Sequence, residues 1–549
     1  MNENFNALKS QRNKLQLVVH LAAMTVVWAG GYPDIIPTAG EIWPRPQEVK
    51  QGHTSMAVDP LDFRFVATDY DCDILQQALE RYLKIITNYP SNVQPQGDGK
   101  SGNFKSSLNL VQVSLGSACE EFPHQGMEES YEIKVNSSGT RSNAIITSQS
   151  IWGILRGLES FSQLLVPVGS VYKLTSTTIR DYPRFCYRGL MIDTARHYIP
   201  VTKIKEMLDL LAMNKFNVLH WHLVDDQSFP YQSDKFPDLS DKGSYSEKHI
   251  YTGKDIAGVI EYARVRGIRI IPEFDTPEHM KSWGPGQPGL LTPCYADDKP
   301  DGTHGPIDPT NERNYEFLKS FLTEVDARFP DDHIHLGGDA VLAGSKCWRS
   351  NPNITKFMEE LGISDKYNKL RALYTKRLLD IVWELPNTDR FLVWEEVFDR
   401  GIDLPDNVIV QVWILHYLDV WKRSLQQITS VGFQTIMSSC WYLTDTIGQN
   451  WRRYYACDPR DFEGTPEQKE LVLGGEACIW GEHVDATNII PTAWPNACAV
   501  GERLWSSTEH TSDPEAAAPR LEEHRCRLLR RGYGVSPVFS SYCDADVDF

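Results

Sequence analysis

The amino-acid sequence predicts an α/β protein in which a (β/α)8 barrel of the TIM type follows a smaller α+β domain. From residue 183 to residue 549, short apolar segments alternate with amphipathic ones, and eight of the apolar segments have the length of strands. Strands that are apolar throughout are typical of parallel sheets covered by helices on both faces. The predicted strands span residues 189–193, 217–224, 269–274, 333–338, 391–397, 408–413, 434–439 and 475–480.

The segments between these strands are predicted to be helices with one apolar face each. Eight such strand–helix units favour a closed barrel. An open, doubly wound sheet is the alternative, but no glycine-rich phosphate loop follows the first strand to support it. The clearest helices span residues 202–214, 255–266, 315–328, 366–385 and, near the C-terminus, 514–531.

Residues 30–182 are expected to form the separate α+β domain. Short apolar segments are mixed there with polar stretches rich in Pro, Gly, Asn and Ser. A helix is predicted at 149–165, because Ile151, Leu155 and Leu158 share roughly one face. We expect this helix to pack on a sheet.

Residues 1–29 have the order of a secretory signal peptide. Lys9, Arg12 and Lys14 precede an apolar run at 15–28, and small residues then offer a cleavage site. The run is short for a membrane span, so a retained N-terminal anchor is the weaker alternative. The prediction is a protein of the secretory pathway, either lysosomal or extracellular.

Proteins of the secretory pathway can form disulfides and carry N-linked glycans, so the cysteines and two sequons become relevant. The 11 cysteines become candidates for disulfides, and their odd number leaves at least one thiol unpaired within the chain. Asn136 and Asn353 begin Asn-X-Ser/Thr triplets and are candidate glycosylation sites. The formal net charge of −18 argues against binding of nucleic acid, whose phosphates need basic patches.

Acidic and aromatic residues follow the predicted strands, at the end where barrel enzymes carry their reactive groups. Carboxylates move protons and stabilise positive charge, and indole rings form walls for sugar rings, so this set is typical of a carbohydrate site. Taken singly, Asp225 or Asp339 could cap the helix that follows it, and any one tryptophan is more often a core residue. The set comprises Asp193, Arg196, His197, Asp225, Asp226, Glu273, Asp275, His279, Asp339, Trp394, Glu395, Glu396, Trp413, Trp441, Tyr442, Trp480 and Glu482.

A competing pattern is the HxH formed by His220 and His222, a spacing that some barrel hydrolases use to hold zinc. Such a site needs further His or carboxylate ligands from other strands. The pair lies in the middle of a predicted strand, and no later predicted strand ends in His. We therefore predict a structural role for it, with no metal and no cofactor.

Nine motifs coincide with those of one known family. They are RGLMIDTARHYIP (188–200), NVLHWHLVDDQSFPY (217–231), EFDTPEH (273–279), HLGGDA (335–340), VWEEVFD (393–399), QVW (411–413), FEGTPEQK (462–469), GGEACIWGE (474–482) and ERLWS (502–506). On these motifs the chain resembles glycoside hydrolase family 20, and within it the animal lysosomal β-hexosaminidases. The resemblance runs from about Trp43 to Cys543 and implies an N-terminal α/β domain followed by a catalytic TIM barrel.

The resemblance also implies a substrate-assisted mechanism, in which the 2-acetamido oxygen of the sugar attacks the anomeric carbon. Asp339 matches the residue that orients the acetamido nitrogen, and Tyr442 the one that hydrogen-bonds the acetamido oxygen. Asp225 and His279 match a pair that supports the catalytic glutamate. The residues that match the sugar-binding walls and hydroxyl contacts are Trp394, Trp413, Trp480, Arg196 and Glu482.

Two further features are implied by the resemblance alone. Subunits of the family pair through the barrel, so a homodimer or a heterodimer with a paralogous subunit is expected. Three disulfides are expected, and the remaining five cysteines are left free or unassigned. The expected pairs are Cys72 with Cys119, Cys294 with Cys347, and Cys526 with Cys543.

The chain departs from the family pattern at three positions. Ala340 stands where the family has its proton-donating glutamate, so hydrolysis of natural glycosides should be strongly impaired. Asp445, shortly after Tyr442, should repel sulfated or sialylated glycans and thus favours neutral substrates. Glu278 stands where a glycine is usual, and it is expected to disturb the supporting pair at its neighbour His279.

Two hypotheses follow. The first is a β-N-acetylhexosaminidase that releases terminal β-linked GlcNAc or GalNAc from glycans, chitooligosaccharides or glycolipids and is impaired at position 340. The second is a secreted glycan-binding protein without catalysis, or an inactive subunit that supports an active paralogue. Both keep an intact sugar pocket.

Overall fold

The computed structural model describes residues 38–88, 104, 106–138, 141–339, 345–414, 419–444, 450–540 and 542–543. The predicted signal peptide, Ala340 and Asp445 lie outside these residues. Within the described ranges, none of the helices combines the length and the apolar character that crossing a bilayer requires.

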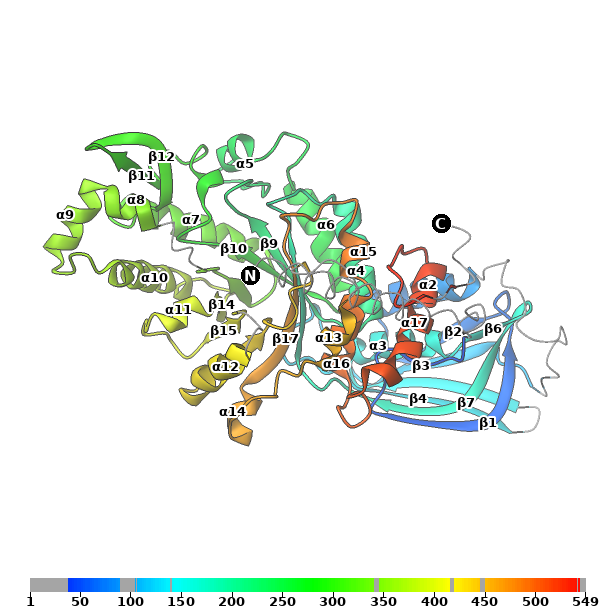
Figure 1. Ribbon diagram of the computed structural model, residues 1–549. Helices are drawn as coiled ribbons and strands as arrows, with labels where there is room; N and C mark the ends of the chain where they lie inside the picture. Colours follow the sequence, from blue (N-terminus) through cyan, green and yellow to red (C-terminus); the bar gives the residue numbers. More distant parts are fainter. Residues whose placement is uncertain are drawn as a thin grey trace, which may run out of the picture.

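Eight parallel strands close into a barrel, which confirms the predicted fold class and rules out the open sheet (Figure 1). Around the barrel the order is β10-β13-β14-β15-β16-β17-β8-β9. The early strands are buried at every residue, as expected for strands covered on both faces. The strands are β8 (Tyr187–Asp193), β9 (Val218–Val224), β10 (Arg269–Phe274), β13 (His333–His335), β14 (Arg390–Trp394), β15 (Val408–Val412), β16 (Gln434–Met437) and β17 (Val472–Ile479).

Helices surround the barrel and complete its hydrophobic core. A two-stranded sheet of β11 (Leu291–Ala296) and β12 (Lys299–Ile307) and a 3-10 turn at Lys281–Trp283 are inserted after β10. The helices are α4 (Val201–Met213), α5 (Asp238–Gly243), α6 (Gly253–Arg264), α7 (Glu312–Arg328), α8 (Ser345–Ser350), α9 (Pro352–Glu360), α10 (Tyr367–Trp383), α11 (Glu396–Asp399), α12 (Val420–Ser430), α13 (Trp451–Ala456), α14 (Pro466–Glu470), α15 (Ile489–Ala493), α16 (Asn496–Trp505) and α17 (Pro514–Arg530).

Several predicted strands are longer than the observed ones, and the two largest differences have a local reason. The strand predicted at 333–338 ends at His335, because Gly337 and Gly338 adopt φ angles of 69° and 94°. Such positive φ angles turn the chain out of the extended conformation. The strand predicted at 391–397 likewise ends at Trp394, where the short helix α11 begins almost at once.

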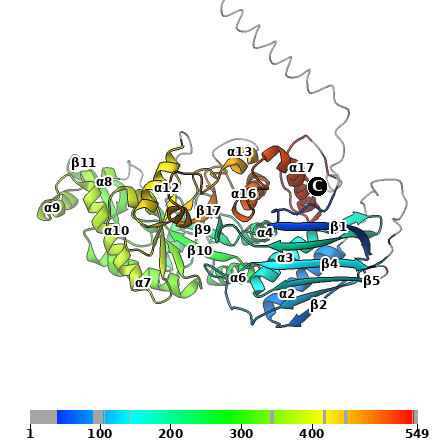
Figure 2. The same cartoon turned by 90° about the horizontal axis from the view of Figure 1, so that it is seen from below.

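The N-terminal domain is a seven-stranded mixed sheet with two helices packed on it (Figure 2). The strand order is β1-β7-β4-β5-β3-β2, and β6 pairs with β7. The predicted helix corresponds to α3 (Ile151–Gln163), which packs on α2 (Asp73–Thr87) and on the sheet. The strands are β1 (Glu48–Val58), β2 (Arg64–Asp69), β3 (Leu110–Leu115), β4 (Tyr131–Ser138), β5 (Arg141–Ser148), β6 (Val166–Val168) and β7 (Val171–Asp181).

A buried ion cluster joins this domain to the barrel. Glu129, just before β4, binds Arg156 of α3 and Arg188 of β8, with nitrogen–oxygen distances of 2.9 and 2.5 Å. Arg156 also donates to the backbone carbonyl of Gly267 at 3.0 Å, beside strand β10. Burying these charges is costly unless they are paired, so the cluster fixes how the two domains meet.

The structure contains four disulfides. Three are the pairs that the resemblance implied, namely Cys72–Cys119, Cys294–Cys347 and Cys526–Cys543. The fourth joins Cys440 to Cys457, two of the cysteines that the sequence left unassigned, and it encloses the segment that carries Tyr442. Cys186, Cys478 and Cys498 take part in none of these four disulfides.

Candidate active site

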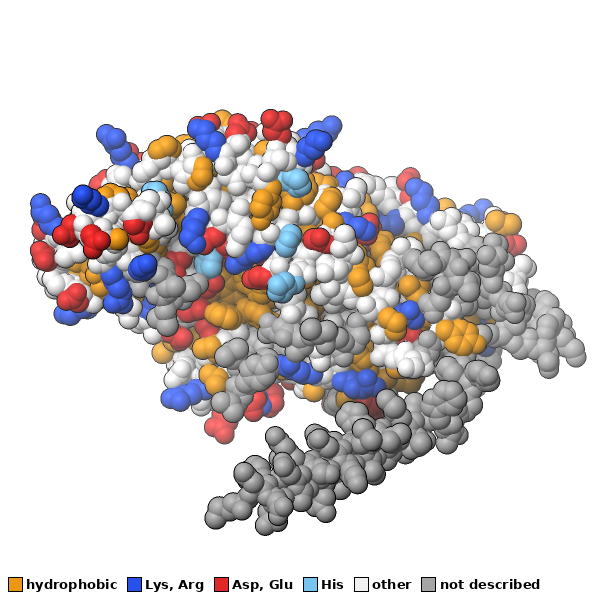
Figure 3. All heavy atoms as spheres, turned by 45° about the horizontal axis from the view of Figure 1, so that its top comes forward, with side chains coloured by type: hydrophobic (Ala, Val, Ile, Leu, Met, Phe, Trp, Pro, Cys, Tyr) orange, Lys and Arg blue, Asp and Glu red, His pale blue; other side chains and the backbone are white. Residues whose placement is uncertain are grey.

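A cavity of about 420 Å³ opens where the barrel strands end. On the face seen in Figure 3, acidic and histidine side chains gather around the middle of the molecule. The cavity size suits a sugar residue, since small-molecule sites span roughly 300–1,000 Å³. Its lining consists of Arg196, Asp339, Trp394, Trp413, Tyr442, Thr444, Trp480, Glu482 and His483.

Asp339 is presented by a tight turn that depends on two glycines. A Cβ atom on Gly337 would lie 1.8 Å from Oδ1 of Asp275, and one on Gly338 would lie 2.4 Å from Val397. The buried Asp275 carboxyl group, whose pKa is raised by burial and by the neighbouring Asp339, also accepts the backbone N–H of Gly338 at 2.8 Å. The turn is therefore pinned from below by Asp275, and it delivers the Asp339 carboxylate into the cavity.

Three indoles and one phenol form the walls. Trp394 is 1% exposed, and its Nε1 donates to Oε1 of Glu273 at 2.8 Å. Trp413 donates from Nε1 to Oε2 of Glu396 at 2.8 Å. The centroid of the Tyr442 ring lies 6.0 Å from that of Trp413 and 6.4 Å from that of Trp480. Carboxyl groups of Glu273 and Glu396 behind the rings thus fix the orientation of two walls.

Arg196 reaches the cavity from the end of β8. Its Nη1 lies 3.1 Å from Asp193 and 2.9 Å from Asp225, and its guanidinium carbon lies 4.8 Å from the centre of the Trp480 ring. Two carboxylates and an aromatic face therefore hold the guanidinium. A planar donor fixed in this way is suited to grip sugar hydroxyls.

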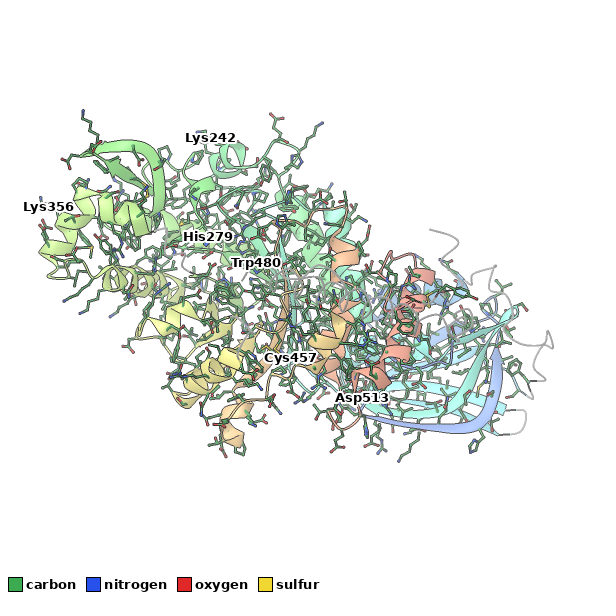
Figure 4. The ribbon with its side chains drawn as sticks, in the orientation of Figure 1. Lys242, His279, Lys356, Cys457, Trp480 and Asp513 are labelled. Atoms are coloured by element: carbon green, nitrogen blue, oxygen red, sulfur yellow. A yellow bond between two sulfur atoms is a disulfide. The ribbon has the colours of Figure 1, made fainter. Side chains whose placement is uncertain are left out.

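His279 connects Asp225 to Asp339. Its Nδ1 lies 3.2 Å from Asp225 and its Nε2 3.5 Å from Asp339. Burial alone would lower the pKa of His279, but the bond to Asp225 and the charge of Asp339 raise it to about 9. Figure 4 labels His279 and Trp480 near the middle of the barrel. His279 is therefore a cation that links two carboxylates beside the cavity.

The contact between His279 and Asp225 is present beside the unusual Glu278. The Glu278 carboxylate pairs with Arg371 of α10, and both side chains are buried. His279 still reaches Asp225, so the structure does not show the disturbance that the sequence predicted at this pair.

Two carboxyl groups near the cavity, those of Glu395 and Glu396, have raised pKa values. Burial, with smaller contributions from Asp399 and Glu396, raises the pKa of Glu395 to about 9. Burial likewise raises the pKa of Glu396 to about 7, despite its bond from Trp413. At mildly acidic pH both groups are therefore neutral.

Family assignment follows from comparisons with known proteins. Residues 185–508 match the model for "Glycosyl hydrolase family 20, catalytic domain", and residues 42–164 match the model for "beta-acetyl hexosaminidase like". The chain belongs to glycosyl hydrolase family 20. The predicted resemblance is thus confirmed over nearly the whole described chain.

Named relatives and solved structures of family 20 agree with this assignment. The beta-hexosaminidase subunit alpha of Bos taurus is 43% identical over 524 residues, covering 93% of this chain and 96% of the relative. The beta-hexosaminidase subunit beta of Felis catus is 45% identical over 532 residues, covering 95% and 98%. The chitobiase of Flavobacterium johnsoniae has a similar structure, with a TM-score of 0.76 and 28% identity over 90% of this chain and 73% of that one.

The family 20 fold brings most of the predicted site residues together at one cavity. Asp225 and His279 lie behind its lining, whereas Ala340 is outside the described residues. Trp441 is fully buried away from the cavity and donates to the backbone of Tyr454. Asp226 pairs with the exposed Lys281 instead. Sequence reasoning missed Thr444 and His483, which line the cavity from loops without any motif signal of their own.

A third histidine lies near the HxH pair. The observed strand β13 ends in His335, whereas the predicted strand at 333–338 did not end in a histidine. His220, Glu273 and His335 offer ligand atoms within 4.8 Å of one another. However, both ring nitrogens of His220 face carboxylates, Glu273 at 3.0 Å and Glu476 at 2.8 Å. Burial would lower the pKa of His220, but these charges raise it to about 9.

Proposed function

We propose that this chain is built to bind terminal, non-reducing β-linked GlcNAc or GalNAc and to act on it as a retaining β-N-acetylhexosaminidase. The observation that carries the proposal is the cavity, in which Asp339, Tyr442 and three tryptophans face one space of about 420 Å³. Family membership supports the same reaction class.

In the proposed reaction the substrate supplies the nucleophile. Trp394, Trp413 and Trp480 enclose the N-acetyl group and one sugar face, and Tyr442 donates to the acetamido oxygen. Asp339 accepts the acetamido N–H and stabilises the positive charge that forms as that oxygen attacks the anomeric carbon. The bond from the anomeric carbon to the leaving oxygen breaks as the oxazolinium ring closes, and that oxygen leaves with the electron pair and takes up a proton. Water later attacks the anomeric carbon and opens the ring with net retention.

Arg196 and Glu482 would hold hydroxyl groups of the sugar. Arg196 is already fixed by Asp193 and Asp225, so it loses little freedom on binding. Glu482 is exposed at the rim of the cavity and can accept from a hydroxyl group. Together they would select the terminal, non-reducing residue of a glycan.

Ala340 limits the proposed reaction at the proton transfer. A positioned general acid contributes roughly 10²–10⁴-fold in rate, and alanine has no proton to donate. We therefore propose strongly impaired hydrolysis of natural glycosides, whose leaving oxygens depart poorly without a proton. Aryl glycosides with good leaving groups should be affected least.

A second candidate function is sugar binding without turnover, as a glycan-binding protein or as the inactive partner of an active paralogous subunit. The methyl side chain of Ala340 favours it, since every residue proposed to hold the sugar is retained. The curated relatives are named as subunits, which supports a homodimer or heterodimer.

Substrate class and cellular location complete the proposal. The acid at 445 favours neutral glycans, chitooligosaccharides or glycolipids over sulfated or sialylated ones. Asn136 on β4 and Asn353 on α9 are exposed and thus accessible to glycosylation. Accessible glycosylation sites support a route through the secretory pathway to the lysosome or the cell exterior.

The test compares this chain with its Ala340→Glu variant on an aryl β-GlcNAc glycoside and on chitobiose, with binding of an oxazoline-mimicking inhibitor measured in parallel. Restored turnover by at least about 10²-fold in the variant supports a hexosaminidase that lacks only its acid. Tight inhibitor binding by two inert proteins supports the binding function instead. Absence of binding by both proteins contradicts the proposal.

A further inference from the structure

Beneath the cavity, a buried histidine links the groups that hold its walls. His222 is fully buried on β9, directly below Arg196 and Trp480. Its Nδ1 lies 2.5 Å from Oε2 of Glu273, and its Nε2 lies 2.9 Å from Oδ2 of Asp225. Both ring nitrogens therefore contact carboxylates.

Each of these two carboxylates holds a different part of the proposed sugar site. Asp225 contacts Arg196 at 2.9 Å and His279 at 3.2 Å. Glu273 accepts from Nε1 of Trp394 at 2.8 Å. The imidazole of His222 is thus the bridge between the hydroxyl-binding arginine on one side and the indole wall on the other.

The protonation of the ring follows from the distances. A neutral imidazole has one N–H and one lone pair, so it can donate to only one of two carboxylates. Arg196 Nη1 also approaches Nε2, at 3.2 Å, but the Asp225 oxygen is nearer and has only lone pairs to offer. Both nitrogens of His222 must then carry protons for both contacts to be attractive.

Charged groups on the surrounding elements agree with this state. Asp193 from β8, Asp225 after β9 and Glu273 on β10 surround the ring, and the nearby cations are Arg196, His279 bound to Asp225, and His220 bound to Glu273. Burial would lower the pKa of His222, but Glu273 and Asp225 raise it well above its usual value. Charge-assisted bonds of this kind are the shortest and strongest available to a side chain.

We propose that His222 is a positioning residue of the sugar site: as an imidazolium bridging Asp225 and Glu273, it sets the positions of Arg196, His279 and Trp394. The proposal rests on the proposed sugar-binding function and deepens it. It gives the HxH motif a task that neither a metal site nor a plain core residue would have.

The chain offers a matched control two residues away. His220 has the same burial, lies on the same strand and also contacts Glu273, at 3.0 Å. Its other nitrogen faces Glu476 below the site, and no contact joins it to Asp225 or Arg196 among the described residues. Both imidazoles reach Trp394 through Glu273, but only His222 also contacts Asp225, so its loss should disturb the sugar site much more than loss of His220.

The experiment measures affinity for the oxazoline-mimicking inhibitor in the wild-type chain, His222→Gln and His220→Gln, with folding checked by circular dichroism. Loss of a charge-assisted bond predicts an affinity about 10- to 100-fold weaker for His222→Gln and less than about 3-fold weaker for His220→Gln. Equal losses in the two variants would overturn the proposal.

A second measurement does not depend on ligand binding or on either variant being well folded. Nuclear magnetic resonance of the wild-type chain labelled at the histidine nitrogens should show two protonated nitrogens on the buried ring of His222, as on that of His220, unchanged from about pH 5 to about pH 8. A neutral His222 that accepts from Arg196 would overturn the proposal. If the wild-type chain binds no inhibitor but His222 is doubly protonated, the proposed function fails while the bridge itself stands.

Discussion

Gly337→Ala tests whether the turn below the cavity positions Asp339. The φ angle of Gly337 is 69°, so an alanine there costs about 1–2 kcal/mol in backbone strain alone. The new Cβ would also lie 1.8 Å from Oδ1 of Asp275. That carboxyl group is 1% exposed and already accepts from Gly338, so it has little room to move.

The magnitudes follow from these two contributions. Overpacking a tight core adds about 1–3 kcal/mol, so Gly337→Ala should lower the free energy of unfolding by about 2–5 kcal/mol. Gly401→Ala is the matched control, because φ is 64° there and nothing lies within 4 Å of the added Cβ. The control should lose only about 1–2 kcal/mol.

The assay combines denaturant unfolding with calorimetric binding of the oxazoline-mimicking inhibitor. A displacement of about 1 Å at a reacting group can cost up to about 10²-fold, so Gly337→Ala should bind the inhibitor roughly 10- to 100-fold more weakly. Gly401→Ala should bind it as the wild type does. Equal loss of stability in the two variants, or unchanged affinity in Gly337→Ala, would refute the argument that Asp275 pins the Asp339 turn.

Three further predictions concern buried charges. Glu129→Ala leaves two buried arginines without their carboxylate and should lower the free energy of unfolding by about 3–5 kcal/mol in denaturant unfolding. The control Glu132→Ala, at a partly exposed ion pair, should lower it by only about 0–1 kcal/mol. Similar losses in the two variants would contradict this prediction. Asp225→Asn removes the hydrogen bond that raises the pKa of His279 to about 9, and a histidine with a raised pKa loses its charge as pH rises through that pKa. Inhibitor affinity should then fall at a lower pH in the variant than in the wild type, and an unmoved midpoint would count against the link. Burial raises the pKa of Glu396 to about 7 from 4.5, so this side chain destabilises the folded state increasingly as pH rises between those values. The free energy of unfolding of Glu396→Gln, compared with that of the wild type, should therefore rise by up to about 3 kcal/mol between about pH 5 and about pH 8. A difference in unfolding free energy that does not change with pH would exclude the effect.

The barrel could be predicted from the sequence because its strands carry the clearest signal in the chain. Segments such as 189–193 and 269–274 are buried on both faces, so apolar residues fill them without interruption. The strand ends were predicted less well where glycines or a short helix act against the apolar pattern. The turn at Gly337 is an example, since its form depends on contact with Asp275, which is distant in the sequence.

The candidate site was predicted from residues that stand at strand ends, and this rule worked for side chains that face the cavity. It could not find the contacts behind them. Glu273 belongs to the predicted strand-end set and His222 to the HxH pattern with a predicted structural role, but nothing in the sequence indicates that the two side chains bond to each other. Their importance comes from pairing across β9 and β10, where the register sets Glu273 beside His222. A one-dimensional pattern contains no information on that register.

The buried charges themselves argue for a pocket that binds sugar, whatever position 340 does. Ion pairs in a core are seldom more stabilising than apolar residues of the same size, so a barrel interior selected for stability alone would not need Asp225, His222 and Glu273. These groups hold Arg196, His279 and Trp394 in fixed positions, which is what preorganised binding requires. The proposed lack of a proton donor at position 340 affects none of these contacts. The loss of the acid and the retention of the binding geometry are therefore separable, and a chain of this kind should bind N-acetylhexosamine ligands even where it turns them over slowly.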